Sequence, residues 1–300
     1  MEMEYPDTID EQRLAVIRDY IDRMPSLSTT VTKVLEICNK PNTSPNDLNR
    51  VISLDPVLTG NVLKLINSAY YSLPNQITSL GRAIIMLGIN TVKNLALSTA
   101  ILGTLKDSGQ LKSLPIDTYW THCLGVGVTA KAIAVLKKIP LTQQEEFFVA
   151  GLLHDLGKVA LNNCFSEDYG QALSLADLEQ GPLYRAEKTM LGLDHALVGQ
   201  IIAEKWQFSN AISQAITFHH RPTDAAKEKR SMVAIVSLAN VYINVYGHGF
   251  AGDGYPGVME LREALELVGI EWSNLQQLNE KVVSEIDKAR IFLEVSTGEA

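Results

Sequence analysis

Apolar residues recur along most of this chain at intervals of about three to five positions, the spacing of helices that bury one face. No run alternates between apolar and polar residues for long enough to indicate a β-strand. The pattern predicts a first helix from about Ile9 to Ile21 and, further along, helices over 116–136, 142–162, 163–178, 182–191, 194–207, 209–220, 229–246, 258–268 and 273–296. We therefore expect an all-α protein.

The sequence also predicts which side chains in these segments are exposed and which are buried. Glu145 and Glu146 stand near the start of the helix 142–162, and we expect them to be exposed there, where the helix dipole favours acidic residues. Tyr70 and Tyr71 are expected to be partly exposed beside a groove between two lobes, and such aromatic side chains are common in recognition surfaces. A group of apolar residues just before them is expected to form core instead of a partner groove: Leu54, Val57, Leu58, Val62, Leu65 and Ile66.

Composition narrows the possible functions. The chain has 300 residues and a net charge of −8, so it lacks the excess of basic residues with which nucleic-acid binding proteins follow phosphates, and we expect no nucleic-acid partner. No apolar run approaches the roughly 18 residues of a membrane span, and the acidic start does not resemble a signal peptide. The three cysteines are far apart, which favours reduced thiols. We expect a cytoplasmic protein with no membrane partner.

The six histidines carry the candidate chemistry. Two polar pairs interrupt apolar helical segments: His154–Asp155 in VAGLLHDLGK and His219–His220 in AITFHHRP. Burying such groups without a partner costs roughly 2–7 kcal/mol for each neutral polar group. Imidazole and carboxylate are ligands that iron, manganese, nickel, cobalt and zinc accept. One ion could bind a pair of adjacent residues if other helices supplied further ligands, and His122 and His195 could do so.

Each of these residues also has a plainer interpretation. A lone histidine on an apolar helix face is usually a hydrogen-bonded core residue, and a histidine pair at a helix C-terminus is favoured by the helix dipole. Asp194 could simply cap the helix that begins at His195. His248 lies in the glycine-rich stretch GHGFAGDGYPG (247–257), which we interpret as a loop outside the site. Only the joint pattern of histidines favours a metal.

That joint pattern resembles a known superfamily. The order His122, His154–Asp155, His195, His219–His220 is similar to that of the HD superfamily of metal-dependent phosphohydrolases, and HDLGK (154–158) resembles the central motif of HD-GYP cyclic-di-GMP phosphodiesterases. Longer phrases over residues 24–245 resemble the HDOD family, the HD-related output domain of bacterial signalling: MPSLSTTVTKVLEICNKPNTSPNDLNRVISLDPVLTGNVLKLINSAYYSLP, SLGRAIIMLGINTVKNLAL, LGLDHALVGQIIAEKW and AISQAITFHHRP.

The resemblance implies a multi-helical, HD-like architecture with two lobes. The expected parts are an N-terminal helix (1–23), the N-terminal lobe of the HDOD unit (24–110), the HD-like histidine-bearing lobe (111–250) and a C-terminal helical extension (251–300). It also implies a set of metal ligands for one or two divalent transition ions, such as Fe, Mn, Ni or Zn: His122, His154, Asp155, His195, His219 and His220.

Two further residues bear on catalysis. Lys158 matches a lysine that lies near the scissile phosphate in catalytic HD relatives, whereas Asn240 stands where those relatives have a last aspartate ligand. A neutral amide is a poorer ligand for a dication, which puts hydrolysis in doubt. We therefore expect a non-catalytic bacterial signalling module that keeps its metal site, with signalling proteins or a small molecule as partners. The alternative is a phosphohydrolase acting on a nucleotide or cyclic dinucleotide, with a metal-activated water and Lys158 stabilising charge.

Overall fold

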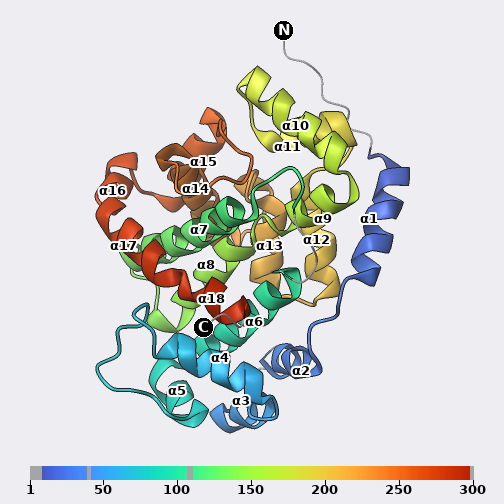
Figure 1. The fold of residues 1–300 in the computed structure, drawn as a ribbon. Helices are drawn as coiled ribbons and strands as arrows, with labels where there is room; N and C mark the ends of the chain where they lie inside the picture. The colour runs from blue at the N-terminus through green and yellow to red at the C-terminus, as the bar shows by residue number, and fades with distance from the viewer. Residues whose placement is uncertain (1–8, 39–41, 107–110, 298–300) are drawn as a thin grey trace.

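The computed structural model describes residues 9–38, 42–106 and 111–297, and every regular element within these ranges is a helix (Figure 1). The elements are α1 (Glu11–Arg23), α2 (Thr29–Cys38), α3 (Pro45–Ile52), α4 (Pro56–Ile66), α5 (Leu80–Leu87), α6 (Ile89–Lys106), α7 (Ile116–Leu136), α8 (Leu141–Leu153), α9 (Leu156–Cys164), α10 (Ser166–Glu179), α11 (Leu183–Leu191), α12 (His195–Lys205), α13 (Asn210–Phe218), the short 3₁₀ turn η1 (Pro222–Asp224), α14 (Arg230–Tyr246), α15 (Val258–Val268), α16 (Trp272–Gln276), α17 (Asn279–Ala289) and α18 (Ile291–Thr297). The predicted all-α fold is confirmed.

The helices form two lobes that share α6 (Figure 1). Helices α2 to α5 surround α6 on one side, and α6 packs against α8 on the other. The second lobe is built on the pair α7 and α8, against which α13 and α14 pack, while α9 contacts α12 and α10 contacts α11. This arrangement leaves the middle of the second lobe enclosed by helix ends, which is where the histidines lie.

The helices at the two ends of the chain pack on helices that are far away in sequence. Helix α1 packs on α9 and α12 of the second lobe, whereas α17 packs on α7 and α18 contacts both α4 and α6. The C-terminal helices therefore touch both lobes. The division into parts at residues 23, 110 and 250 stays a prediction, and residue 110 itself lies outside the described residues.

Glycines bring α7 and α8 into direct backbone contact. A Cβ atom on Gly151 would lie 2.8 Å from the Cα of Gly127, and one on Gly127 would lie 2.7 Å from the carbonyl oxygen of Phe148. Cβ atoms do not approach other atoms so closely, so only glycine permits this crossing. The short connection 137–140 makes the two helices antiparallel, as in an αα-hairpin.

The helix expected over 142–162 is in fact broken. Helix α8 ends at Leu153 and α9 begins at Leu156, with Asp155 in a non-helical backbone conformation (φ −95°, ψ 11°). The apolar spacing continues through the break, which is why the sequence pattern did not reveal it. The new direction lets α9 cross α12 closely, because a Cβ on Gly157 would meet the carbonyl oxygen of His195 at 2.0 Å.

Several expectations about exposure were also wrong. Glu145 is only 3% exposed, because its carboxylate pairs with Lys131 inside the fold. Leu54 and Val57 are 70% and 73% exposed, since they lie at the turn into α4 and in its first turn, whereas the other members of their group are buried: Leu58, Val62, Leu65 and Ile66.

Tyr70 is buried at 8% exposure, against expectation, while Tyr71 is half-buried. The segment 273–296, expected as one helix, divides into α16, α17 and α18.

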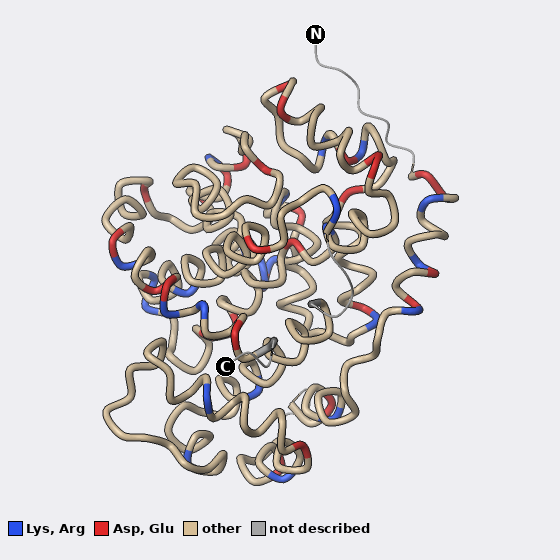
Figure 2. The backbone as a smooth tube through the Cα atoms, viewed as in Figure 1, with Lys and Arg blue, Asp and Glu red and all other residues tan. Residues whose placement is uncertain are grey.

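The surface carries charges of both signs. Figure 2 shows acidic and basic residues interspersed along the backbone of both lobes. The three cysteines, Cys38, Cys123 and Cys164, are free thiols, as expected. Among the described residues, no helix combines the length and the apolar character that crossing a bilayer requires.

Candidate metal centre

All six candidate ligands converge on one place in the second lobe. His122 comes from the first half of α7, and the break between α8 and α9 supplies His154 and Asp155. His195 is the first residue of α12, and the two remaining histidines, His219 and His220, directly follow α13. Five of the six are essentially inaccessible to solvent and His220 is half-buried. The structure thus brings together every residue of the predicted set.

The carboxylate of Asp155 lies in the middle of the cluster. Its Oδ2 is 3.5 Å from Nε2 of His122 and 3.3 Å from Nε2 of His154. Its Oδ1 is 3.3 Å from Nε2 of His195 and 3.7 Å from Nε2 of His219. One carboxylate therefore faces two groups of histidines with its two oxygens, and each group could hold an ion: His122, His154 and Asp155 in one, His195, His219 and His220 in the other.

Hydrogen bonds on the outer side of the rings fix how the histidines face the centre. Nδ1 of His154 lies 2.7 Å from the carbonyl of Gly151, and Nδ1 of His219 lies 2.9 Å from that of Ile216. A carbonyl only accepts, so Nδ1 carries the proton in both rings and Nε2 presents its lone pair to the cluster. This orientation by outer hydrogen bonds is usual for metal-binding histidines.

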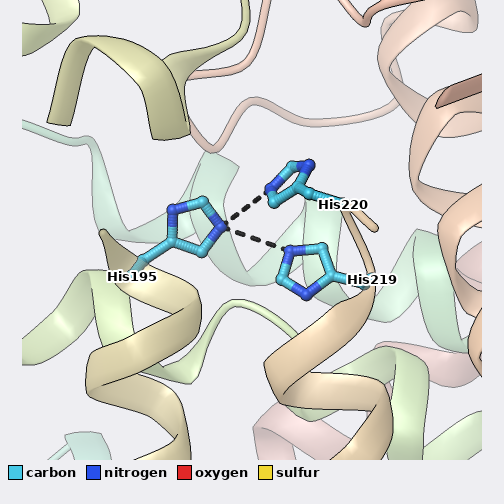
Figure 3. A group of neighbouring side chains, drawn as sticks. All are labelled: His195, His219 and His220. Atoms are coloured by element: carbon cyan, nitrogen blue, oxygen red, sulfur yellow. Dashed lines mark hydrogen bonds between the residues drawn. The ribbon is translucent and has the colours of Figure 1, made fainter. Parts of the chain in front are cut away.

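The second group is the tighter one. Nε2 of His195 lies 3.2 Å from Nε2 of His219 and 3.0 Å from Nε2 of His220, and the three rings point toward one another from α12 and from the end of α13 (Figure 3). Asp194 caps α12 by accepting a hydrogen bond from the backbone amide of Leu197 at 2.8 Å, as its plainer interpretation predicted. The same cap holds His195 at the very start of the helix, facing the centre.

Several buried polar atoms in the cluster make no hydrogen bond among the described residues: both ring nitrogens of His122, Nε2 of His154 and both carboxylate oxygens of Asp155, of which Oδ2 forms an ion pair with Lys158. Each such atom costs roughly 1–3 kcal/mol when nothing satisfies it. Lone pairs and a carboxylate gathered around one point are what a divalent transition ion would satisfy. The residues present therefore fit a metal ion, which would act there as a Lewis acid.

The ionisation of the cluster agrees with this interpretation. Burial lowers the pKa of His122 to about 3, so that imidazole is neutral, the form that binds metals. Burial together with neighbouring histidines also lowers the pKa of His219 and of His220 well below the usual range. Burial alone would raise the pKa of Asp155, but His154 and Lys158 outweigh it and keep the group a carboxylate.

Glu187 is a site residue that sequence reasoning missed. It lies on α11, fully buried, and its Oε2 accepts hydrogen bonds from the backbone amide of His195 at 2.9 Å and from Nδ1 of that ring at 2.6 Å. Burial opposes a charge on His195, yet the Glu187 carboxylate outweighs it and raises the pKa of that histidine. The sequence feature that could have revealed Glu187 is its position on the apolar face of α11, which Leu183, Ala186 and Leu191 define.

Lys158 lies beside the cluster but is fully engaged. Its ammonium donates hydrogen bonds to the carbonyl of Ala251 at 2.9 Å and to Oδ2 of Asp253 at 2.6 Å, and contacts Oδ2 of Asp155 at 2.8 Å. Two hydrogen bonds and one ion pair therefore hold this ammonium in place. Asp253, from the GDGYPG stretch, is a second residue that the sequence did not reveal. The stretch forms the expected loop, but this aspartate turns inward.

The loop after α14 closes the cluster from outside. At Gly249 (φ +85°) its backbone lies so near α7 that a Cβ would stand 2.3 Å from the amide nitrogen of His122. The cavity left beside His219, His220, Asn240 and Asp253 has a volume of only about 20 Å³. That is room for about one water molecule. The amide oxygen of Asn240 accepts a hydrogen bond from Asn244 at 3.1 Å, so it is also engaged.

The helical fold and the histidine–aspartate cluster define a protein of the HD-related class, and the sequence places it more narrowly. Residues 24–222 match the sequence model of the HDOD domain. This match covers more than half of the chain, and the protein belongs to the HDOD family. An uncharacterized protein of Treponema pallidum (strain Nichols) is 26% identical over 230 residues, which are 76% of this chain but 44% of that protein. The chain therefore spans less than half the length of this relative.

Solved structures show the same fold. An HDOD domain protein of unknown function from Geobacter sulfurreducens is 26% identical, with a TM-score of 0.74 over 94% of this chain and 98% of that one. A candidate phosphohydrolase from Shewanella amazonensis SB2B is 21% identical, with a TM-score of 0.69 over 94% and 98% of the two chains. A candidate signal transduction protein from Marinobacter aquaeolei VT8 is 19% identical, with a TM-score of 0.73 over 98% and 63%. The last two show a shared fold only.

Proposed function

We propose that this HDOD protein is a bacterial signal-transduction module that holds one or two divalent transition-metal ions and does not hydrolyse phosphate esters. It would act in the cytoplasm on signalling proteins or in response to a small molecule, with neither nucleic acid nor a membrane as partner. The metal ligands would be His122, His154, Asp155, His195, His219 and His220, with Glu187 orienting one of them.

The state of Lys158 carries the non-catalytic part of the proposal. A lysine that stabilises a phosphate must offer at least one donor to it, and the ammonium of Lys158 is already held by two hydrogen bonds and by an ion pair with Asp155. The loop that supplies two of those acceptors also covers the cluster and leaves about 20 Å³ beside it. A phosphate ester could reach the ions only if this loop moved away.

The unsatisfied atoms around Asp155 support the metal part. A chain without use for an ion would be expected to pair these buried atoms or replace them with apolar ones, because each lowers stability. A phosphohydrolase remains the second candidate function, since the two groups around one carboxylate are the kind of arrangement that two-metal hydrolases use.

Elemental analysis of the purified full chain tests the metal assignment. We expect one to two equivalents of a transition metal in the wild type, loss of that metal in His154→Ala, and unchanged content in His248→Ala, a matched change outside the cluster. A wild type that stays metal-free after incubation with Mn²⁺, Fe²⁺, Ni²⁺ and Zn²⁺ would overturn the assignment.

Hydrolysis assays test the rest. Metal-loaded protein is incubated with bis(p-nitrophenyl) phosphate and with cyclic di-GMP, and we expect no turnover. Turnover by the wild type that is lost in His154→Ala would contradict the non-catalytic assignment and establish the phosphohydrolase. The variant Asn240→Asp, which restores the missing carboxylate, is expected to stay inactive because Lys158 and the loop are unchanged.

A further inference from the structure

A larger cavity lies at the opposite ends of α7 and α8 from the histidine cluster. Its volume is about 340 Å³, within the range of roughly 300–1,000 Å³ of small-molecule sites. Its wall combines three parts of the fold: the segment after α4 together with α5 and α6, the ends of α7 and α8 that meet at their connection, and α17. Both lobes and the C-terminal helices thus contribute to one hollow.

Most of this wall is apolar. Leu73, Leu87 and Val128 line it together with the rings of Tyr70 and Tyr71, which contact each other edge to face at 5.1 Å between centroids. At the rim, Val135 and Leu141 are 41% and 69% exposed to solvent. Apolar residues that continue from a cavity to its exposed rim lose contact with water when a molecule enters, which favours binding.

The charged groups of the wall are balanced in sign. The buried carboxylate of Glu145 accepts hydrogen bonds from Lys131 at 2.7 Å and from the hydroxyl of Tyr71 at 2.7 Å. Nearer solvent, α17 adds Lys281 and Glu285, one charge of each sign. An ionised ligand would find each favourable charge accompanied by an opposing one, so the wall favours an uncharged molecule.

One residue of the wall, Thr91, has a hydroxyl that forms no hydrogen bond with the described residues. Thr91, on the first turn of α6, is 5% exposed and lines the cavity, and its hydroxyl makes no hydrogen bond within the described part of the chain. Threonines elsewhere in this helix, such as Thr99 and Thr104, donate to backbone carbonyls one turn earlier. The free hydroxyl of Thr91 can therefore donate to, or accept from, a molecule inside the cavity.

We propose that this cavity is a binding site for a small, uncharged and mainly apolar molecule with one hydrogen-bonding group, which meets the hydroxyl of Thr91. The site is separate from the histidine cluster and does not depend on a metal. Because both lobes and α17 form its wall, an occupant stabilises their association by mass action.

Fluorescence titration of the full chain with N-phenyl-1-naphthylamine, an uncharged apolar reporter with one N–H, tests the site. We expect saturable binding of one molecule per chain. Val135→Trp places a large side chain at the rim, and we expect at least tenfold weaker binding. Leu136→Trp is the matched control, since Leu136 is the next residue on α7, is 40% exposed and is not part of the wall; its affinity should equal that of the wild type.

Two further measurements define the ligand class. Thr91→Val keeps the shape of the side chain but removes the hydroxyl, and we expect about threefold weaker binding from the loss of one hydrogen bond. 1-Octanol should displace the reporter at lower concentration than octanoate. The proposal is overturned if the wild type shows no saturable binding, if both tryptophan variants bind equally well, or if octanoate is the better competitor. Thermal melting of each variant checks that it is folded.

Discussion

The antiparallel helices α7 and α8 carry a buried polar cluster at each end, and the two clusters differ in how well they are satisfied. At one end, His122, His154 and Asp155 leave ring nitrogens and carboxylate oxygens without hydrogen-bond partners. At the other end, Lys131 and Glu145 pair at 2.7 Å, and both residues also bond to tyrosine hydroxyls. About two and a half helical turns separate His122 from Lys131 on α7, and the same separation holds between Glu145 on α8 and His154 just after it.

This difference distinguishes a binding site from a network that only stabilises the fold. A network whose charges neutralise each other and whose donors meet acceptors is complete, so it stabilises the junction of the lobes and shapes the cavity there. A network that lacks a hydrogen-bond partner for several buried atoms is incomplete, and a cation could complete it. Lys158 lies next to the incomplete network, yet two carboxylates and a backbone carbonyl already hold its ammonium, which favours a structural role.

The largest effect is expected from Lys158→Met. This change leaves Asp155 and Asp253 buried without their cation, and removing one partner of a fully buried pair costs about 3–5 kcal/mol. Chemical denaturation in the presence of a chelator measures the loss. Lys188→Met is the matched control, because its pair with Asp194 is longer at 3.4 Å and 34% exposed on the lysine side; it should cost under about 1 kcal/mol. Equal losses in the two variants would refute a structural role for Lys158.

A smaller effect is expected at the complete network from Glu145→Gln. The amide keeps the shape but leaves the ammonium of Lys131 without its charged partner, at a cost of about 1–3 kcal/mol. The exposed fraction of Lys131, 22%, lets water compensate in part. Metal content should be unchanged. If Glu145→Gln also lost the metal, the two clusters would not be independent and the comparison would fail.

The smallest effect belongs to Tyr71→Phe. It removes one hydrogen bond to Glu145, whose other oxygen stays paired with Lys131, so we expect a loss of about 1 kcal/mol in the free energy of unfolding. A loss as large as that of Glu145→Gln, measured by the same denaturation, would show that the hydroxyl and not the ion pair holds this end together.

The sequence predicted the helices and the six converging side chains because both leave local signatures. Apolar spacing indicates which face of a helix is buried, and the histidine motifs follow one another along the chain in an order similar to that of the HD superfamily. What it could not predict depends on contacts between distant segments. The break after His154 follows from the close crossing of Gly157 and α12, while apolar residues continue at helical spacing on both sides.

The inward turn of Asp253 had no local signal either. It lies in an irregular loop, where no periodicity indicates which side chain points toward the core, and its partner Lys158 is 95 residues away. Glu187 is an intermediate case, since a glutamate on an apolar helix face could have been noticed. The burial of Glu145 was missed because its position near a helix start has a simpler explanation in the helix dipole.

The backbone contact between Gly127 and Gly151 also bears on the order in which the protein folds. Helices joined by a short connection form contacts that are local in sequence, and such contacts form fast because little chain entropy is lost in closing them. The α7–α8 hairpin is therefore expected to form early, and at one end it already brings together His122, His154 and Asp155. The histidines of α12 and α13 arrive only when those helices dock. The chain would then bring its candidate metal ligands together in two kinetic stages, with half of them gathered before the lobe is complete.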